Sequence, residues 1–343
     1  MYQFNTYRPN LRTLVIQCLL VSCTALGASI TFASSPSPAE IEKVLADAHS
    51  KFKGVKDGAS ADYIPALAEV DPELFGISLV TPDGRVYDVG DSNYTFSIQS
   101  ISKAFIAATV IENQGTQNMM DKIGVDATGQ PFNSIKAIEM IDERSVNPLV
   151  NAGAIATVSM VQGNTPEAKW ATIAGSLDAF AGRKLQVMQD VYASETATNG
   201  RNQAIAKLLA AYGRLYDDVG VSVDLYTRQC SVGVTSHDLA VMAGTLAAGG
   251  KNPVTGKQVI SAENVPEVLA IMATAGLYDD SGIWLYNVGL PAKSGVGGGI
   301  VAVSPGDYGI AAFSPRVDAA GNSVRAQLAI DYIVERLGGN IFE

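Results

Sequence analysis

Apolar residues recur along the chain at two kinds of spacing, and their order predicts the secondary structure. Residues 39–52 carry apolar side chains at the spacing of one helix face, which predicts an amphipathic helix. Two β-rich runs follow at 76–81 and 85–90, joined by the turn sequence Pro-Asp-Gly at 82–84. These runs predict a β-hairpin.

Helical spacing dominates the middle of the chain, which is Ala-rich and has glycine at several predicted helix ends. The predicted helices are 101–113, 154–161, 170–182, 203–216 and 236–250. Strand-like runs separated by Gly and Pro then return, and a last amphipathic helix closes the chain. These elements are predicted at 291–296, 298–305, 308–315 and 323–337.

This order predicts an α+β fold in which both chain ends build one antiparallel sheet with flanking helices. The sheet lobe is expected to span about 34–108 and 288–343, and a helical lobe about 109–287. The cleft between the two lobes is the default position of a site.

Composition narrows the classes of ligand. The chain has 343 residues, of which 47% are hydrophobic and 17% charged, enough for a substantial core. Its formal net charge of -10 disfavours binding to nucleic acid or to an anionic membrane, and no run of Lys and Arg offsets it. A small soluble molecule is the expected partner.

Residues 1–33 have the features of a secretory signal peptide, which would leave 34–343 as the mature protein. Arg8 and Arg12 precede an apolar run that ends at Ala33, before a Ser/Pro-rich linker. A transmembrane anchor is less favoured because polar residues interrupt the run. We therefore expect export, to the periplasm, and no stable membrane insertion once the leader is removed.

The cysteines give a second reading of the leader. The sequence Leu-Val-Ser-Cys ending at Cys23 resembles a lipobox, so a lipid anchor on Cys23 is the alternative, although the apolar stretch continues well past it. Cleavage after the leader would remove Cys18 and Cys23 and leave Cys230 alone. An intrachain disulfide is then excluded, and Cys230 is most simply a small buried residue.

The sequence gives little support for catalysis by a histidine or by a metal ion. His49 and His237 are the two histidines, and both sit in ordinary helical settings that suggest structural roles, His237 beside a predicted N-cap at Ser236. The sequence contains no HExxH, CxxC, Walker-type glycine loop or Asp-rich calcium loop. Neither a metal nor another cofactor is expected.

A serine and a lysine offer the alternative to histidine. Ser100 and Lys103 are three apart at a predicted helix start, so they share a face, whereas Ser102 points elsewhere. Apolar neighbours favour burial of Lys103, and burial lowers a lysine pKa enough for it to accept a proton. Lys293-Ser294-Gly295, on a predicted strand before further glycines, completes the SxxK and KSG pair of serine β-lactamases and penicillin-binding proteins.

Further segments make the resemblance more specific. The chain resembles the bacterial and mitochondrial-type L-glutaminases, a family with the β-lactamase-like fold, in order over about 60–330. The segments that carry the likeness are 96–105, 147–155, 194–206, 224–232, 276–300 and 314–326. A homo-oligomer, as a dimer or tetramer, is expected, although the sequence does not fix its state.

The resemblance also implies roles for individual residues. Ser100 would be the nucleophile, and Lys103 would activate it together with Tyr226 and Tyr278. A tyrosine serves as a base only if a neighbouring ammonium stabilises its phenolate. Lys293 is kept in the family, but its distance from the pocket cannot be read from sequence.

The remaining roles concern the substrate, L-glutamine. Glu195 would hold its ammonium, and uncharged side chains would hold its carboxylate and amide. The residues implied in substrate binding are Tyr63, Gln99, Ser100, Asn151, Glu195, Asn202, Tyr226, Tyr278 and Val296. Backbone N–H groups of Ser100 and Val296 would form the oxyanion hole.

The predicted reaction is hydrolysis of the glutamine side-chain amide to glutamate and ammonia through a serine acyl-enzyme. One alternative is a β-lactamase or penicillin-binding hydrolase, which Ser-Val-Asn at 145–147 supports by mimicking the S-x-N element. Another is a receptor that binds glutamine without cleaving it.

Overall fold

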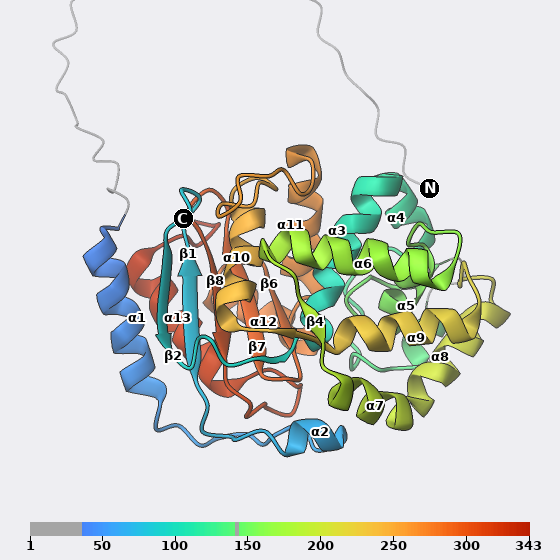
Figure 1. Ribbon diagram of the computed structural model, residues 1–343, viewed down its shortest axis with the longest axis horizontal. Helices are drawn as coiled ribbons and strands as arrows, with labels where there is room; N and C mark the ends of the chain where they lie inside the picture. Colours follow the sequence, from blue (N-terminus) through green and yellow to red (C-terminus); the bar gives the residue numbers. More distant parts are fainter. Residues whose placement is uncertain (1–35, 141–143) are drawn as a thin grey trace, which may run out of the picture. The chain divides into compact units, whose positions relative to one another are not determined.

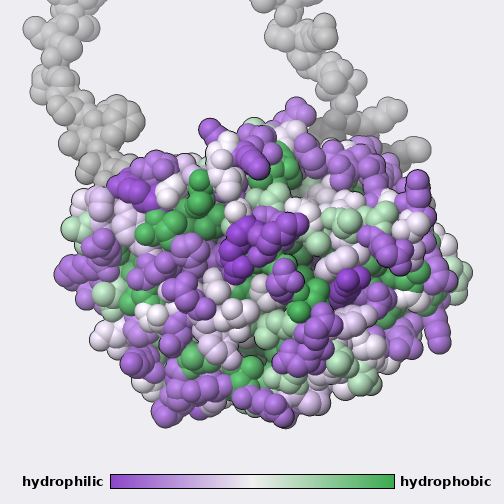
Figure 2. Space-filling model, in the orientation of Figure 1, coloured by the Kyte–Doolittle hydropathy of each residue, from purple (hydrophilic) through white to green (hydrophobic). Residues whose placement is uncertain are grey.

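The computed structural model describes residues 36–140 and 144–343 (Figure 1). The predicted leader at 1–33, with Cys18 and Cys23, lies outside the described residues. Within the described ranges, no helix is long and apolar enough to cross a membrane. Hydrophilic side chains predominate on the face drawn in Figure 2, with hydrophobic ones in small scattered groups.

A five-stranded antiparallel sheet has the order β2-β1-β8-β7-β6. Its strands are β1 (Gly76–Val80), β2 (Val86–Gly90), β6 (Ala292–Gly295), β7 (Gly299–Ser304) and β8 (Tyr308–Phe313). The two ends of the chain meet where β1 pairs with β8, with Gly76 opposite Phe313 and Val80 opposite Gly309. The sheet predicted from both chain ends is confirmed, as is the hairpin of β1 and β2.

Helices cover both faces of this sheet (Figure 1). α1 (Pro38–Phe52) and α13 (Val324–Leu337) pack on one face, where Leu45 and Ile330 join the core cluster of Ile77. Because the central strands β1, β7 and β8 are buried along their whole length, they read as continuous apolar runs.

α10 (Ser236–Ala247) covers the opposite face. It lies so close to β8 that a Cβ added at Gly309 would approach the Gly244 nitrogen to 2.0 Å. The helical segment predicted at 109–287 is therefore not confined to a separate lobe. The N-cap of α10 is Thr235, in a capping box with Asp238, and not Ser236 as the sequence suggested.

The helices from α3 to α9 make up the second half of the structure, on the right in Figure 1. They are α3 (Ser102–Gln114), α4 (Thr116–Lys122), α5 (Asn151–Ser159), α6 (Pro166–Ala181), α7 (Gln189–Thr198), α8 (Gly200–Ala211) and α9 (Val219–Cys230). The remaining helices are α2 (Pro65–Ala68), α11 (Val265–Ala275) and α12 (Ser281–Asn287). α3 and α5 are buried along almost every residue, so their sequences show little amphipathic contrast.

A small second sheet, of order β3-β5-β4, was not predicted. Its strands are β3 (Phe96–Ser97), β4 (Gln186–Val187) and β5 (Val232–Val234), and two or three residues are too few to show an alternating pattern. β3 leads into α3, and β5 follows α9. Their pairing therefore brings the start of α3 next to the end of α9.

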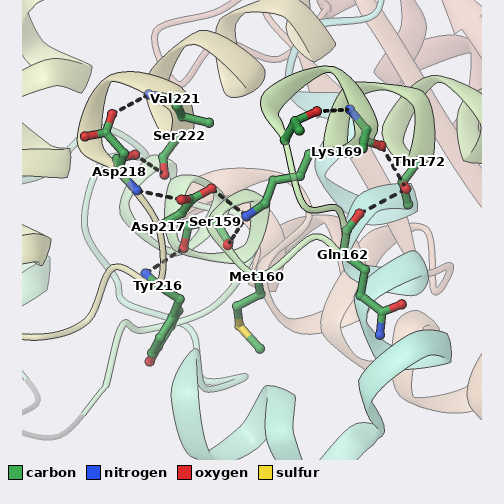
Figure 3. Close-up of polar contacts among 12 residues, drawn as sticks. Ser159, Met160, Gln162, Lys169, Thr172, Tyr216, Asp217, Asp218, Val221 and Ser222 are labelled. Atoms are coloured by element: carbon green, nitrogen blue, oxygen red, sulfur yellow. Dashed lines mark hydrogen bonds and ion pairs between the residues drawn. The ribbon is translucent and has the colours of Figure 1, made fainter.

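A polar cluster ties together the helices that carry Asn151 and Tyr226 (Figure 3). The ammonium of Lys169, on α6, pairs with Asp217 and donates to the Ser159 carbonyl at the end of α5. Asp218 then caps α9 by accepting a hydrogen bond from the Val221 N–H at 3.0 Å. The cluster fixes the last residue of α5 against the start of α9. Asn151 and Tyr226, which line the pocket described next, lie toward the opposite ends of these two helices.

Candidate active site

A pocket of about 140 Å³ lies at the start of α3. Eight of the ten residues expected in the site line it, namely Tyr63, Gln99, Ser100, Asn151, Glu195, Asn202, Tyr226 and Val296. The other two, Lys103 and Tyr278, are buried and contact this lining. The structure therefore brings together all ten side chains from six separate segments of the chain.

Ser100 lies in a 3₁₀ turn, Gln99–Ile101, between β3 and α3. Its neighbour Gln99 has a φ of 51°, in the left-handed region that is unfavourable for a residue with a Cβ. Among the described non-glycine residues only Gln99 and Tyr278 have a positive φ, and both belong to this site. Backbone strain of this kind concentrates where a precise geometry is needed.

Lys103 is 1% exposed, as its apolar neighbours predicted. Its Nζ donates to Asn151 Oδ1 at 2.7 Å and to the Leu149 carbonyl at 3.4 Å, and lies 5.6 Å from the centre of the Tyr226 ring. Burial lowers the pKa of Lys103 to about 8. A neutral amine is therefore available near neutral pH.

Two buried tyrosines flank this lysine and serine. The Tyr226 hydroxyl donates to Asn151 Oδ1 at 3.1 Å, the same oxygen that Lys103 contacts. The Tyr278 hydroxyl donates to the Ser294 carbonyl at 3.3 Å. Burial raises the pKa of Tyr278 to about 12, and the side chain of Ser100 and Ser294 oppose that rise. Tyr278 thus enters the reaction as a neutral phenol beside Ser100.

Glu195, on α7, places a carboxylate in the same pocket. It is 9% exposed and accepts a hydrogen bond from Gln99 Nε2 at 2.6 Å. Burial raises the pKa of Glu195 to about 7, and the bond from Gln99 and the charge of Lys103 oppose that rise. Within the described part of the chain no cation forms an ion pair with this buried carboxylate, so it is suited to receive one from a ligand.

Uncharged groups make up the neighbouring wall. Asn151 Nδ2 donates to Asn202 Oδ1 at 2.9 Å, which joins the first residue of α5 to α8. Tyr63, 54% exposed, stands at the mouth of the pocket. Asn151 does not cap α5, whose cap residue is Val150. These amides and the phenol supply neutral donors to a ligand.

Glycines bring the backbone of Val296 close to Ser100. A Cβ added at Gly295 would lie 3.0 Å from the Ile98 carbonyl oxygen, and one at Gly297 would lie 2.7 Å from that of Ser97. Side chains at either position would force apart the turn after β6 and the segment before Ser100. The turn that carries Val296 therefore packs directly against the segment that leads to Ser100.

Lys293, left open by the sequence, lies beneath Tyr278. It is fully buried, and its Nζ donates to the carbonyls of Gly276 and Ser294 at 2.7 Å each. The same Nζ lies 4.1 Å from the centre of the Tyr278 ring. Lys293 does not line the pocket, and its contact with the predicted site residues is with the Tyr278 ring.

The Ser-Val-Asn motif at 145–147 has a local role. Asn147 Oδ1 accepts from the backbone N–H groups of Leu149 and Val150, and its Nδ2 donates to the Asp126 carbonyl at 2.7 Å. Asn147 does not line the pocket. The motif therefore shapes the entry to α5 and does not supply the S-x-N element of a penicillin-binding site.

Several lining residues were not predicted from sequence, among them Phe132, Asn133, Arg201 and Cys230. Arg201 Nε donates to the Asn133 carbonyl at 2.8 Å and joins α8 to the loop that carries Phe132. No local pattern marks Phe132 or Asn133. Cys230 could have been found, because it lies one helical turn after Tyr226 and faces the same way.

The histidines take no part in this pocket. His49 Nε2 lies 3.0 Å from the Phe75 carbonyl oxygen, and His237 Nδ1 lies 2.8 Å from Asp88 Oδ2. Within the described residues, no group of three His, Cys, Asp or Glu side chains could hold a metal ion. The chemistry offered by the pocket is that of a serine, an amine and two phenols.

A family model described as Glutaminase matches residues 58–342. The chain belongs to the glutaminase family. It is 58% identical over 310 residues to a glutaminase of Colwellia psychrerythraea, covering 90% of this chain and all of the relative. It is 52% identical over 309 residues to a glutaminase of Mycobacterium marinum, covering 90% of this chain and 97% of the relative.

Solved structures agree with this assignment. A structure described as a probable glutaminase, ybaS, is 46% identical with a TM-score of 0.89, covering 90% of this chain and all of the other. A Bacillus glutaminase structure is 30% identical with a TM-score of 0.80, covering 88% of this chain and 99% of the other. The predicted family, β-lactamase-like fold and enzyme class are confirmed: the chain is an amidohydrolase that converts L-glutamine to L-glutamate and ammonia.

Proposed function

We propose that this glutaminase acts through an ester between Ser100 and the γ-carbonyl of L-glutamine. The observation that carries the proposal is that Ser100 and the buried carboxylate of Glu195 line one pocket, and that the buried amine of Lys103 bonds to its wall at Asn151. Serine is a weak nucleophile unless a nearby group accepts its proton. Lys103, with its pKa lowered to about 8, supplies that group.

The reaction proceeds in two steps. Ser100 Oγ attacks the γ-carboxamide carbon while its proton passes into the network of Tyr278, Tyr226 and Lys103. The oxyanion accepts hydrogen bonds from the Ser100 and Val296 backbone N–H groups. The carbon–nitrogen bond then breaks, and the network returns the proton to the departing ammonia.

Water completes the cycle. It attacks the γ-glutamyl ester and gives its proton to the same network, the bond from the carbonyl carbon to Ser100 Oγ breaks, and Ser100 regains a proton. Glutamate is released. One water is consumed for each ammonia formed, so the two steps sum to hydrolysis of the amide.

Substrate choice follows from the charges in the pocket. Free glutamine carries an ammonium, which Glu195 would hold as an ion pair in a site that excludes water. Its carboxylate and side-chain amide would bond to Tyr63, Asn151 and Asn202. A β-lactam lacks the amino-acid zwitterion, so these groups would stay unpaired against it.

We expect ammonia release from L-glutamine and little or none from L-asparagine, whose carbonyl lies one methylene nearer to the zwitterion and falls short of Ser100. Hydrolysis of a penicillin is not expected. The test follows ammonia from both amino acids, and opening of the β-lactam ring, at equal enzyme concentration. Covalent labelling of Ser100 by a fluorescent penicillin, without ammonia release from glutamine, would favour the rival hydrolase. Binding of glutamine with no turnover would favour a receptor.

The pH dependence of KM tests the role of Glu195. Its pKa is raised to about 7, so the carboxylate is protonated as pH falls through that value and can no longer pair with the ammonium. KM for glutamine is therefore expected to rise below about pH 7, and Glu195→Gln to raise KM about a hundredfold and remove this dependence. Initial rates across this pH range give both values.

Asp190→Asn is the matched control, because Asp190 lies on the same helix, is exposed and does not line the pocket. Its KM should keep the wild-type value and the wild-type pH dependence. A Glu195→Gln enzyme with unchanged KM would mean that the ammonium binds elsewhere.

We also propose that the first 33 residues direct export to the periplasm and that the mature enzyme works as a dimer or tetramer. The order of two arginines, an apolar run and a small residue before a Ser/Pro-rich linker supports export. Mass spectrometry of the protein from the exported fraction tests the cleavage site, with a lipid on Cys23 as the alternative outcome. Light scattering of the mature enzyme tests the oligomeric state.

A further inference from the structure

We propose that Asn322 is a positioning residue for Tyr278: it holds the strained turn that directs the Tyr278 hydroxyl at Ser100. The inference rests on the role given to Tyr278 in the proposed function. Asn322 belongs to the segment 314–326, one of the segments that resemble the glutaminases but contribute no side chain to the pocket lining.

The turn needs to be held. Tyr278 begins the 3₁₀ turn Tyr278–Asp280 with a φ of 57°, a backbone conformation that a residue with a Cβ adopts only when its surroundings impose it. Ser281 Oγ binds one side of the turn, donating to the Tyr278 carbonyl at 2.8 Å and accepting from the Leu277 N–H at 3.0 Å. The Asp280 N–H closes the turn by donating to the Leu277 carbonyl at 3.0 Å. The carboxylate of Asp280 still needs a hydrogen-bond donor.

Asn322 supplies that donor and also reaches the other end of the turn. Its Nδ2 donates to Asp280 Oδ2 at 3.1 Å and, more weakly, to the Leu277 carbonyl at 3.5 Å, so one amide joins the residue before Tyr278 to the end of the turn. The side chain is fully buried, and its Oδ1 has no partner within the described part of the chain. A buried amide with an unpaired oxygen destabilises the fold, so its value here lies in the donors.

The loop around Asn322 is rigid enough to place that amide. Asp318 Oδ1 accepts hydrogen bonds from the backbone N–H groups of Ala320, Gly321 and Asn322 at 3.0 Å each. Gly321, with a φ of 98°, lies against the tyrosine itself, since a Cβ there would stand 3.6 Å from Tyr278 Cε2 and 3.2 Å from Val296 Cγ1. The loop thus supports the Tyr278 ring from one side and its backbone from another.

Asn322→Asp keeps the size of the side chain, replaces its donors with acceptors and sets a carboxylate against Asp280. We expect kcat to fall about thirtyfold to a hundredfold with KM within about threefold, because Tyr278 is displaced while Glu195, Asn151 and Asn202 stay in place. In a Tyr278→Phe background, the same change should lower kcat less than about threefold, because the hydroxyl that it positions is already gone.

Asn252→Asp is the matched control. Asn252 is equally buried, and its Nδ2 donates to the carbonyls of Ala179 and Phe180 at 3.1 and 2.9 Å, but it does not line the pocket. This variant should lower Tm and leave kcat of the folded enzyme within about threefold of wild type. If Asn322→Asp does not fold, Asn322→Ala removes the same donors without adding charge.

Equal losses of kcat on Asn322→Asp in the wild-type and Tyr278→Phe backgrounds would overturn the positioning role and leave the proposed function intact. If Asn322→Asp lowers kcat no more than Asn252→Asp does, the positioning role is overturned as well. Wild-type kcat in Tyr278→Phe alone would refute the part that the proposed function gives to Tyr278, and this inference with it.

Discussion

Ser100→Ala is expected to reduce glutamine hydrolysis about 10⁴-fold or more, because Ser100 is the only serine among the described residues that line the pocket. Ser100 is 6% exposed and the side chain is small, so the fold should persist with little change in Tm. Ammonia release by the purified variant measures the loss, and circular dichroism verifies the fold. The wild-type enzyme should also be labelled on Ser100 by a glutamine analogue with an electrophilic γ-carbon.

Ser102→Ala is the natural control, because Ser102 is a second buried serine two residues away. Its Oγ donates to the Gln99 carbonyl at 2.7 Å and accepts from Gln229 Nε2 at 3.2 Å. Ser102 therefore supports the backbone of the turn that carries Ser100. Losing that support should cost about 1 kcal/mol of stability, and the variant should stay active within about tenfold of wild type. Wild-type turnover by Ser100→Ala, or an inactive but folded Ser102→Ala, would refute the choice of nucleophile.

The long elements were predictable because each carries a pattern of its own. The hairpin of β1 and β2, the three late strands and the two outer helices α1 and α13 all appear where spacing and turns indicated. The small sheet of β3, β4 and β5 was missed since strands this short carry no alternation. α10 was assigned to the wrong surroundings, because a helix that is buried on nearly every side has no polar face to indicate its neighbour.

The site was predictable in two unequal ways. Ser100 and Lys103 follow from local spacing and composition, and the burial of Lys103 is confirmed. Glu195, Asn151 and Asn202 stand at the starts or ends of different helices, so only the resemblance to a family pointed to them. Phe132 reaches the pocket from a loop, and Arg201, near the start of α8, is bonded to that same loop, an arrangement that leaves no periodic trace in the sequence.

The structure also changes how Lys103 is understood. The helix spacing placed it beside Ser100, yet its hydrogen bonds run to Asn151 and to the Leu149 carbonyl. The mechanism that we propose therefore routes the proton of Ser100 to the amine through the two tyrosines, of which Tyr226 shares the acceptor Asn151 Oδ1 with the lysine. Asn151 thus has two roles: its side chain lines the pocket, and its Oδ1 orients the ammonium of Lys103.

Lys103→Met tests which group receives that proton. Methionine fills the space of the lysine stem, and removing a buried ammonium costs little stability, because Asn151 Oδ1 keeps its bond from Tyr226. We expect kcat to fall about 10³-fold. The neutral amine is the active form and the pKa of Lys103 is about 8, so wild-type kcat should rise with pH and level off above about pH 8. In the variant this rise should disappear.

Lys293→Met provides the comparison, because Lys293 is as deeply buried as Lys103. Its hydrogen bonds in the described part of the chain go to the carbonyls of Gly276 and Ser294, and its Nζ lies against the Tyr278 ring. Its loss should disturb Tyr278 and lower kcat about tenfold while the rise toward pH 8 remains. The two variants together distinguish the lysine that accepts the proton from the lysine that only holds Tyr278 in place. If the rise survives in Lys103→Met and vanishes in Lys293→Met, the lysine beneath Tyr278 is the acceptor, and the proton leaves Ser100 through Tyr278 in the opposite direction.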